Sequence, residues 1–177
     1  MNTVEVLEAL KKDGFGDGLA LFEGPKDPAI VLPREKLHAV MKQLRDARHL
    51  SFELCILVTG THMTEKVDAK TKAITREQHF EMIWHLRSIK HRSLVALKCR
   101  LPYADPTVDS IADLWPAADW HERETFDLLG IVFNGHPNLR RILLPDDWLG
   151  HPLRKDYVYP KEYQGINLEV DAPWPTP

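Results

Sequence analysis

The sequence predicts an α+β fold, in which a small mixed or antiparallel sheet is covered by helices and followed by an extended C-terminal arm. Short apolar runs alternate with amphipathic helical patterns as far as about residue 101, which predicts strands and helices in one layer each. Two runs of period two, at 79–87 and 95–101, are joined by a short basic turn. Ten of the 13 prolines and four of the five tryptophans lie from residue 102 onward, so the chain changes character there.

The first elements are a short helix and two short strands. Residues 2–12 are typical of a helix, because Asn2 can cap its start and Glu5, three positions later, completes a capping box. The apolar runs 19–23 and 29–33 flank a Gly-Pro turn and predict two strands.

A second helix and a third strand follow. The helix begins at Pro33 and Arg34, and four apolar residues at spacings of three and four form one face of it: Leu37, Val40, Met41 and Leu44. Residues 52–58 are a compact apolar run suited to a buried strand. The polar stretch 59–78 after it is expected to be a loop.

The next pair of runs predicts a hairpin. The TREQ before His79 resembles a capping box, which would favour a helix. However, apolar and polar residues alternate strictly from His79 to Arg87, and they alternate again over 95–101. We therefore expect two antiparallel strands joined by the turn SIKHRS.

Composition excludes several classes of protein. A chain of 177 residues with 44% hydrophobic and 28% charged residues fits one globular domain plus an extension. No apolar run reaches the roughly 20 residues of a membrane-spanning helix, and the N-terminus does not resemble a secretory signal, so the cytoplasm is the expected compartment. A net charge of -3 with interleaved signs indicates no nucleic-acid partner.

The two cysteines point away from redox chemistry on this chain. Cys55 and Cys99 each lie in an apolar run and form no CxxC spacing, which is typical of small buried hydrophobic residues. An iron–sulfur cluster normally takes four thiolate ligands. We therefore expect no cluster bound by this chain alone.

The densest charge lies on a helix predicted over 119–129, between Pro116 and Gly130. At about 100° per residue, one stripe of this helix holds four polar or aromatic side chains: Trp120, Arg123, Glu124 and Asp127. Glu122 falls instead beside Phe126 and Leu129, so its carboxylate is expected to be the most buried. Such a carboxylate needs a partner, and the nearest cations in the sequence are Arg140, Arg141, Arg154 and Lys155. The pairing can be internal, intermolecular or both.

Two Gly-His-Pro units, in 135–141 and 150–155, are each followed by paired basic residues. Proline restricts the preceding histidine, so each unit predicts a sharp turn that holds arginine in a fixed direction. Arginine and tryptophans such as Trp148 are favoured anchors at protein interfaces. We expect His136 and His151 to be turn residues bonded to local backbone rather than metal ligands.

Enzymatic motifs are weak. His121 and Glu122 begin like the zinc-binding HExxH helix, but Thr125 occupies the second histidine position. The sequence has no GxSxG, no Walker loop and no dinucleotide fingerprint. A free-standing carboxylate metalloenzyme built on Glu122 and Glu124 remains the alternative to a binding role.

The segments WHERETFDLLGI, HPNLRRIL and WLGHPLRKDY, densest from Trp115 to Tyr159, together resemble the 30 kDa subunit family of respiratory complex I, the proton-pumping NADH:quinone oxidoreductase. The resemblance implies an α+β domain over 1–112, a partner-docking segment over 113–160 with the Glu-Arg-Glu helix and His-Pro-Arg turns, and an extended Pro-rich tail over 161–177. The residues implied to form the partner interface or a structural network are Trp120, Glu122, Arg123, Glu124, Asp127, His136, Pro137, Arg140, Arg141, Trp148, His151, Pro152, Arg154, Lys155 and Asp156.

The resemblance also implies partners. It implies a cofactor-free subunit in the peripheral arm, on the cytoplasmic side of the inner (plasma) membrane, with no catalytic residues of its own. The partners implied are the quinone-site (49 kDa-type) chain and neighbouring Fe-S subunits, with FMN, Fe-S clusters and quinone all on other chains. Related subunits occur in ferredoxin-using relatives and membrane-bound hydrogenases, and the sequence leaves that choice open. Because it ends at Pro177, the fused form that continues into the quinone-site polypeptide is not expected.

Overall fold

The computed structural model describes residues 1–24, 28–68, 71 and 73–168. Its helices are α1 (Thr3–Leu10), a π-helical turn (Lys11–Phe15), a 3-10 turn (Arg34–Lys36), α2 (Leu37–Asp46) and α3 (Ala118–Leu129). Its strands are β1 (Ala20–Phe22), β2 (Ala29–Val31), β3 (Leu54–Met63), β4 (Lys66–Val67), β5 (Ile74–Arg76), β6 (His79–Ser88), β7 (Ser93–Pro102), β8 (Thr107–Asp109), β9 (Val132–Asn134), β10 (Glu162–Tyr163) and β11 (Ile166–Asn167).

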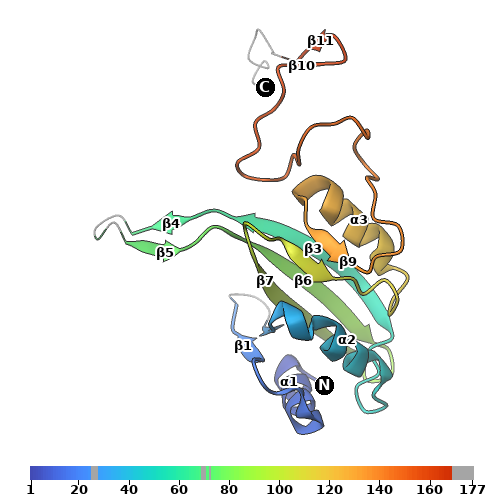
Figure 1. The fold of residues 1–177 in the computed structure, drawn as a ribbon. Coiled ribbons are helices and arrows are strands. Elements are labelled where there is room, and N and C mark those ends of the chain that lie inside the picture. Colours follow the sequence, from blue (N-terminus) through green and yellow to red (C-terminus); the bar gives the residue numbers. More distant parts are fainter. Residues whose placement is uncertain (25–27, 69–70, 72, 169–177) are drawn as a thin grey trace, which may run out of the picture.

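The central sheet has five strands in the order β1-β2-β7-β6-β3 (Figure 1). β2 pairs parallel to β7, and the other neighbours are antiparallel. The predicted hairpin is the β6–β7 pair, in which Trp84 lies opposite Leu97. The α+β prediction with a mixed sheet is confirmed.

The predicted helices form for the reasons given by their sequences. Asn2 Oδ1 accepts the Glu5 amide at 2.8 Å and Glu5 Oε2 accepts the Asn2 amide at 3.0 Å, so the capping box of α1 is complete. In α2, all four residues of the predicted apolar face are fully buried: Leu37, Val40, Met41 and Leu44.

One face of the sheet and the helices share a single core. Alternate residues of β6, from Phe80 to Leu86, are fully buried, whereas the residues between them are partly exposed. Side chains of α1, α2 and α3 join this cluster. α3 lies over β3 at Gly60, where an added Cβ would lie 2.9 Å from Leu129 Cδ1. The glycine therefore lets the helix approach the strand closely.

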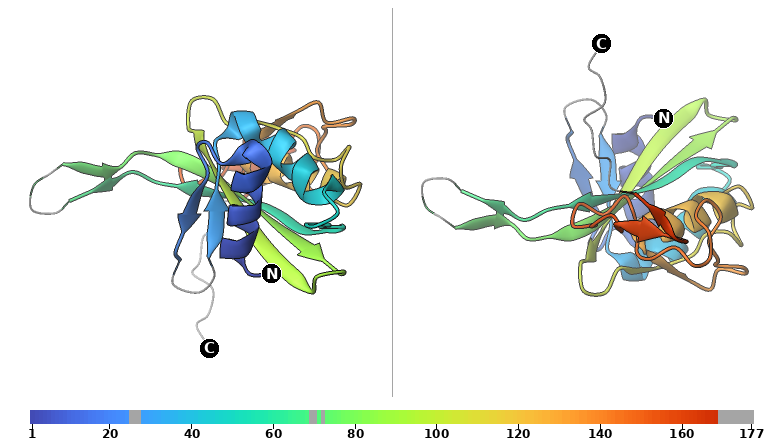
Figure 2. Two further views of the ribbon diagram at one scale, coloured as in Figure 1. Left: turned by 90° about the horizontal axis from the view of Figure 1, so that it is seen from below. Right: turned by 90° about the horizontal axis from the view of Figure 1, so that it is seen from above.

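The loop expected at 59–78 is wrong. β3 continues to Met63, and β4 and β5 then form a two-stranded ribbon that projects from the domain (Figure 2). The ribbon is polar because both its faces are exposed: Lys66, Val67 and Ile74 are all exposed. An exposed ribbon buries no face, so its sequence lacks the apolar alternation by which strands are predicted.

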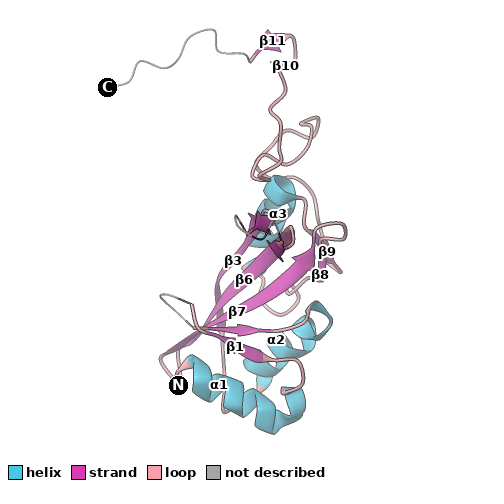
Figure 3. Ribbon diagram, turned by 90° about the vertical axis from the view of Figure 1, so that its left-hand side faces the viewer, coloured by secondary structure: helices cyan, strands magenta, loops and turns pink. Residues whose placement is uncertain are grey.

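The C-terminal part leaves the domain after β9, which pairs parallel to β8. We call residues 135–160 the arm; it has no long element and extends beyond α3 (Figure 3). Within the tail expected to be extended, β10 and β11 form a small hairpin, and residues 169–177 lie outside the described residues. In the described ranges no helix has the length and apolar character needed to cross a membrane.

Candidate functional site

Asp127, in the last turn of α3, holds the start of the arm. Its carboxylate is fully buried. Oδ2 accepts three consecutive backbone amides, from Ile142 at 3.0 Å, Leu143 at 2.8 Å and Leu144 at 2.9 Å, and Arg141 Nη1 donates to Oδ1 at 2.7 Å. Burial opposes the charged form, but these donors outweigh it and the pKa of Asp127 lies below its ordinary value.

Arg141 links the helix to the second turn of the arm. Its other terminal nitrogen, Nη2, donates to the carbonyls of Trp148 and Gly150, each at 3.1 Å. His151 Nδ1 donates to the Asp127 carbonyl at 2.8 Å. One guanidinium thus joins three separate pieces of backbone, which is the fork geometry for which arginine is suited.

Arg123 makes a weaker connection to the same stretch. Its Nε donates to the Arg140 carbonyl at 3.3 Å, and its Nη2 lies 3.5 Å from the Arg141 carbonyl. The guanidinium lies 5.8 Å from the ring of Trp120, which is 67% exposed. The predicted stripe is therefore divided, because the arm covers Arg123 and Asp127 and leaves Trp120 and Glu124 exposed.

Glu122 is fully buried, as predicted, but the cationic partners predicted for it are wrong. Ser110 Oγ donates to Oε2 at 2.5 Å and the Ile111 amide donates to Oε1 at 2.9 Å. Burial raises the pKa of Glu122 to about 7, although both donors lower it. Glu122 turns toward the segment after β8, whereas the arginines of the arm reach the side of α3 that carries Asp127.

The two histidines of the turns both reach α3. His136 Nδ1 accepts the Asn138 amide at 3.0 Å, as expected for a turn histidine, and its Nε2 donates to the Asp119 carbonyl at 3.2 Å. Its Nε2 also lies 3.9 Å from Glu122 Oε2. The expected local bond is present for His136, but His151 bonds to backbone 24 residues away.

Arg154 fastens the end of the arm. Its Nε donates to the Leu129 carbonyl at 2.6 Å, and its guanidinium lies 5.2 Å from the Phe80 ring centre. Gly130 ends α3 with φ +72°, and an added Cβ there would lie 2.6 Å from both Arg154 Nη2 and His151 Nε2. A glycine at this position therefore allows both the helix cap and the approach of the arm.

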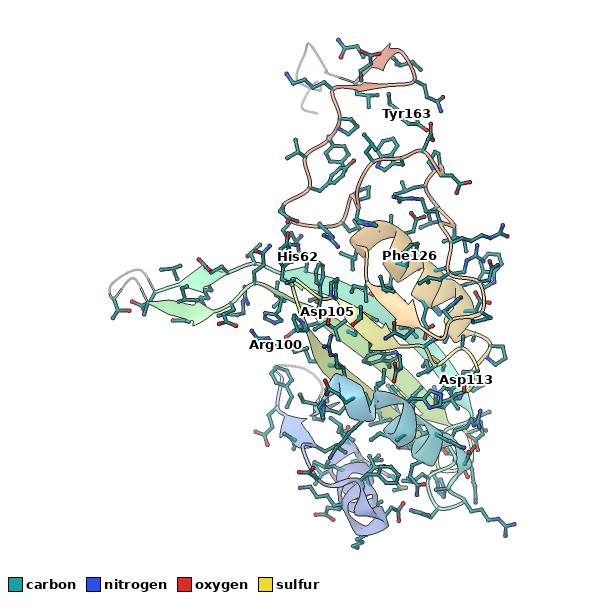
Figure 4. All side chains as sticks on the ribbon, viewed as in Figure 1. His62, Arg100, Asp105, Asp113, Phe126 and Tyr163 are labelled. Carbon is teal, nitrogen blue, oxygen red and sulfur yellow. The ribbon has the colours of Figure 1, made fainter. Side chains whose placement is uncertain are left out.

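The sequence analysis missed His62, which receives the arm on the sheet (Figure 4). Its ring stacks on Phe80 and Tyr103, and its Nδ1 accepts the Lys155 amide at 2.9 Å. Tyr103 Oη donates a short hydrogen bond to Asp156 Oδ2. The available signal was the position of His62, which continues the period-two pattern of β3 through Gly60 onto the core face.

The arm leaves a row of apolar side chains uncovered. Five of them are more than half exposed: Leu143, Leu149, Leu153, Val158 and Tyr159. Pro137, Arg140 and Lys155 are also exposed, whereas Pro152 is half-buried. Trp148 is half-buried, with its ring 4.9 Å from that of Tyr163.

The carboxylates on which a metalloenzyme would depend are engaged otherwise. Glu122 is bonded to Ser110 and Ile111, Asp127 is paired with Arg141, and Glu124 points to solvent. Across the part of the chain that the structure describes, histidine, cysteine and acidic residues form no group of three or more that could hold a metal ion.

The fold and these contacts define a class of protein, a small α+β domain with an ordered C-terminal arm. A family model described as "Respiratory-chain NADH dehydrogenase, 30 Kd subunit" matches residues 30–163. The chain belongs to this family, which confirms the resemblance drawn from its sequence.

Two curated relatives are each named as the C-type subunit of NADH-quinone oxidoreductase. The one from Nocardioides sp. is 46% identical over 137 residues, which are 76% of this chain and 51% of the relative. The one from Nocardia farcinica is 41% identical over 168 residues, which are 90% of this chain and 62% of the relative. The chain thus spans about half to two thirds of the length of these relatives.

Two solved structures are similar. The trypsin-resistant fragment of Nqo5 is 27% identical with a TM-score of 0.59, over 76% of this chain and 99% of the fragment. A chain of the membrane-bound sulfane sulfur reductase, an archaeal respiratory membrane complex, has a TM-score of 0.63 at 20% identity, over 88% of this chain and 84% of that one. The second likeness concerns the fold alone.

Proposed function

We propose that this chain is a structural subunit of an NADH:quinone oxidoreductase of the complex I type, and that its arm packs on a neighbouring subunit. Family membership and the names of the curated relatives support the enzyme complex. One observation carries the docking role: bonds within the chain hold the arm in one shape, while its apolar side chains remain exposed.

An ordered segment without a core of its own is suited to docking. Exposed apolar groups clustered on a segment favour burial against another protein. A segment that is already ordered loses less conformational entropy on binding, so more of the contact free energy appears as affinity. The Asp127–Arg141 network supplies this order, and the five uncovered side chains of the row supply apolar surface.

The family suggests which chains the arm meets. We propose the quinone-site (49 kDa-type) chain as the main partner, with Fe-S subunits nearby, and place FMN, the clusters and quinone on those partners. The chain then acts indirectly, by keeping the electron-transfer subunits in register. It is held at the cytoplasmic face of the membrane through the complex.

Affinity capture tests the proposal. The chain is tagged in its host, the membranes are solubilised gently, and captured subunits and NADH-dependent quinone reduction are measured. Leu149→Asp and Val158→Asp are expected to lower the recovery of partners by at least about tenfold, because each places a charge in an apolar contact. The matched control is Ile89→Asp, in the β6–β7 turn, since Ile89 is 62% exposed and lies outside the arm.

Three outcomes distinguish the alternatives. Loss of partners in the arm variants alone supports docking through the arm. Equal recovery in all variants contradicts it. Capture of a ferredoxin-using or hydrogenase-type complex, instead of NADH-oxidising subunits, would change the electron donor and leave the docking role in place.

A further inference from the structure

His62 is a buried ionisable residue at the junction of the domain and the arm. Its side chain is fully buried. It belongs to β3, and it is held between the rings of Phe80, with centroids 4.7 Å apart, and Tyr103, with centroids 5.5 Å apart. The Lys155 amide donates to Nδ1 at 2.9 Å. This bond joins residues 93 positions apart, so it exists only while the arm is docked.

The bond determines where the imidazole carries its proton. Since Nδ1 accepts a hydrogen bond from Lys155, the neutral ring has its proton on Nε2. The Gln78 side-chain amide lies 2.9 Å from Nε2, and such an N–H needs an acceptor, which the amide oxygen of Gln78 supplies. A second proton, on Nδ1, would set one N–H against another and remove the acceptor for Lys155.

The charges that face His62 come from the arm and the neighbouring strand. Asp156 Oδ1 lies 3.5 Å from Nδ1 and favours a charged ring, while Tyr103 holds the other oxygen of that carboxylate. Arg154, Lys155 and His79 all oppose a positive charge on the ring. A protonated ring would therefore exchange the Lys155 amide for Asp156 and leave that amide without its acceptor.

We propose that His62 is the proton-sensitive latch of the arm: its neutral form holds Lys155 and keeps the arm docked, and protonation releases it. This inference rests on the proposed function, because it concerns how the docking segment is presented to a partner. The latch works in the isolated chain and needs no partner.

The direction of the pH effect follows from the burial of His62. Burial lowers the pKa of His62 below its ordinary value of 6.5, and it outweighs the attraction of Asp156. The docked state thus binds fewer protons than the undocked state. Docking is strongest above about pH 6.5 and weakens as the pH falls below that value toward the pKa of the docked ring.

Amide hydrogen exchange of the full chain tests the latch. The protection factor of the Lys155 amide, corrected for intrinsic exchange, is expected to fall about tenfold from about pH 7.5 to about pH 5.5. His62→Asn keeps an acceptor near the position of Nδ1 and cannot be protonated, so its protection should stay constant. His62→Phe keeps the stacking and lacks the acceptor, so its protection should be at least about fivefold lower at every pH.

Two controls separate this effect from others. His49→Asn removes a histidine that is 54% exposed and paired with Asp13, and it should behave as the wild type. The Ala47 amide, bonded to Gln43 at the end of α2, reports whether the domain itself opens. His151, whose pKa is also lowered, mainly by burial, is unchanged in both His62 variants.

The outcomes are distinct. The inference is overturned if His62→Asn retains the pH dependence of the wild type, which would assign the effect to His151, or if His62→Phe retains full protection at neutral pH. Loss of partner capture by the arm variants bears only on the proposed function, because exchange is measured without a partner.

Discussion

Arg141 and Asp127 form a buried ion pair, 2.7 Å from Nη1 to Oδ1, between the arm and the end of α3. The same carboxylate accepts three amides of the arm through Oδ2. Charged residues that suggest an interface in the sequence therefore act first within the chain, where they give the arm its shape. The surface left for a partner is the apolar row together with exposed residues such as Trp120 and Arg140.

Asp127→Ala should detach the start of the arm. Removing one member of a buried pair leaves Arg141 and three amides without their acceptor, which typically costs about 3–5 kcal/mol. Urea unfolding and limited proteolysis of the arm measure the effect. Glu124→Ala, on the exposed side of the same helix, is the control and should change the free energy of unfolding by less than about 0.5 kcal/mol. Equal effects of the two substitutions would contradict the role given to Asp127.

Glu122→Gln should make the protein more stable in alkaline solution. The pKa of Glu122 is raised, chiefly by burial, from 4.5 to about 7, so the folded state binds the extra proton. Its contribution is complete below about pH 4.5 and is lost as the pH rises through 7, by on the order of 3 kcal/mol. Glutamine resembles the protonated acid and cannot ionise.

Urea unfolding at about pH 5.5 and pH 8.5 checks this. The variant should gain stability over the wild type at the higher pH, whereas Glu124→Gln should show no such gain. A wild-type curve with the same pH dependence as Glu122→Gln would show that Glu122 is not the group responsible.

Gly130→Ala should both strain the cap of α3 and displace the arm. Alanine at φ +72° costs about 1–2 kcal/mol, and its Cβ would lie 2.6 Å from Arg154 and His151. Gly135→Ala is the matched control, because its φ is +77° and nothing lies within 4 Å of the added Cβ. Thermal denaturation should show a larger loss for Gly130→Ala, by at least about 1 kcal/mol. Equal losses would mean that the approach of the arm does not depend on Gly130.

Arg154→Ala and Arg140→Ala should weaken assembly more than they weaken the fold of residues 1–101, and for different reasons. Arg154 binds the Leu129 carbonyl, so its loss should lower the exchange protection of the arm as well as the recovery of partners. Arg140 is exposed, so its loss should lower recovery alone, by up to about tenfold. Circular dichroism monitors the domain. Melting of the domain with unchanged recovery would reverse this ranking.

Much of the domain could be predicted because its signals are local. The capping box of Asn2 and Glu5, the apolar face of α2 and the alternation of β6 each follow from neighbouring residues. The polar stretch 59–78 failed, since a ribbon exposed on both faces carries no pattern of burial. The partner of Glu122 failed too, because nearness in sequence does not show which side of α3 the arm crosses.

The sequence by itself determined the elements, the family and the burial of Glu122, because periodicity, capping and dense motifs depend on residue order alone. Only the tertiary structure decided that Asp127 pairs with Arg141, that Ser110 serves Glu122, and that His62 receives Lys155. These bonds join residues 12 to 93 positions apart. Their partners are chosen by how helix, sheet and arm pack together, and that packing depends on the whole chain at once.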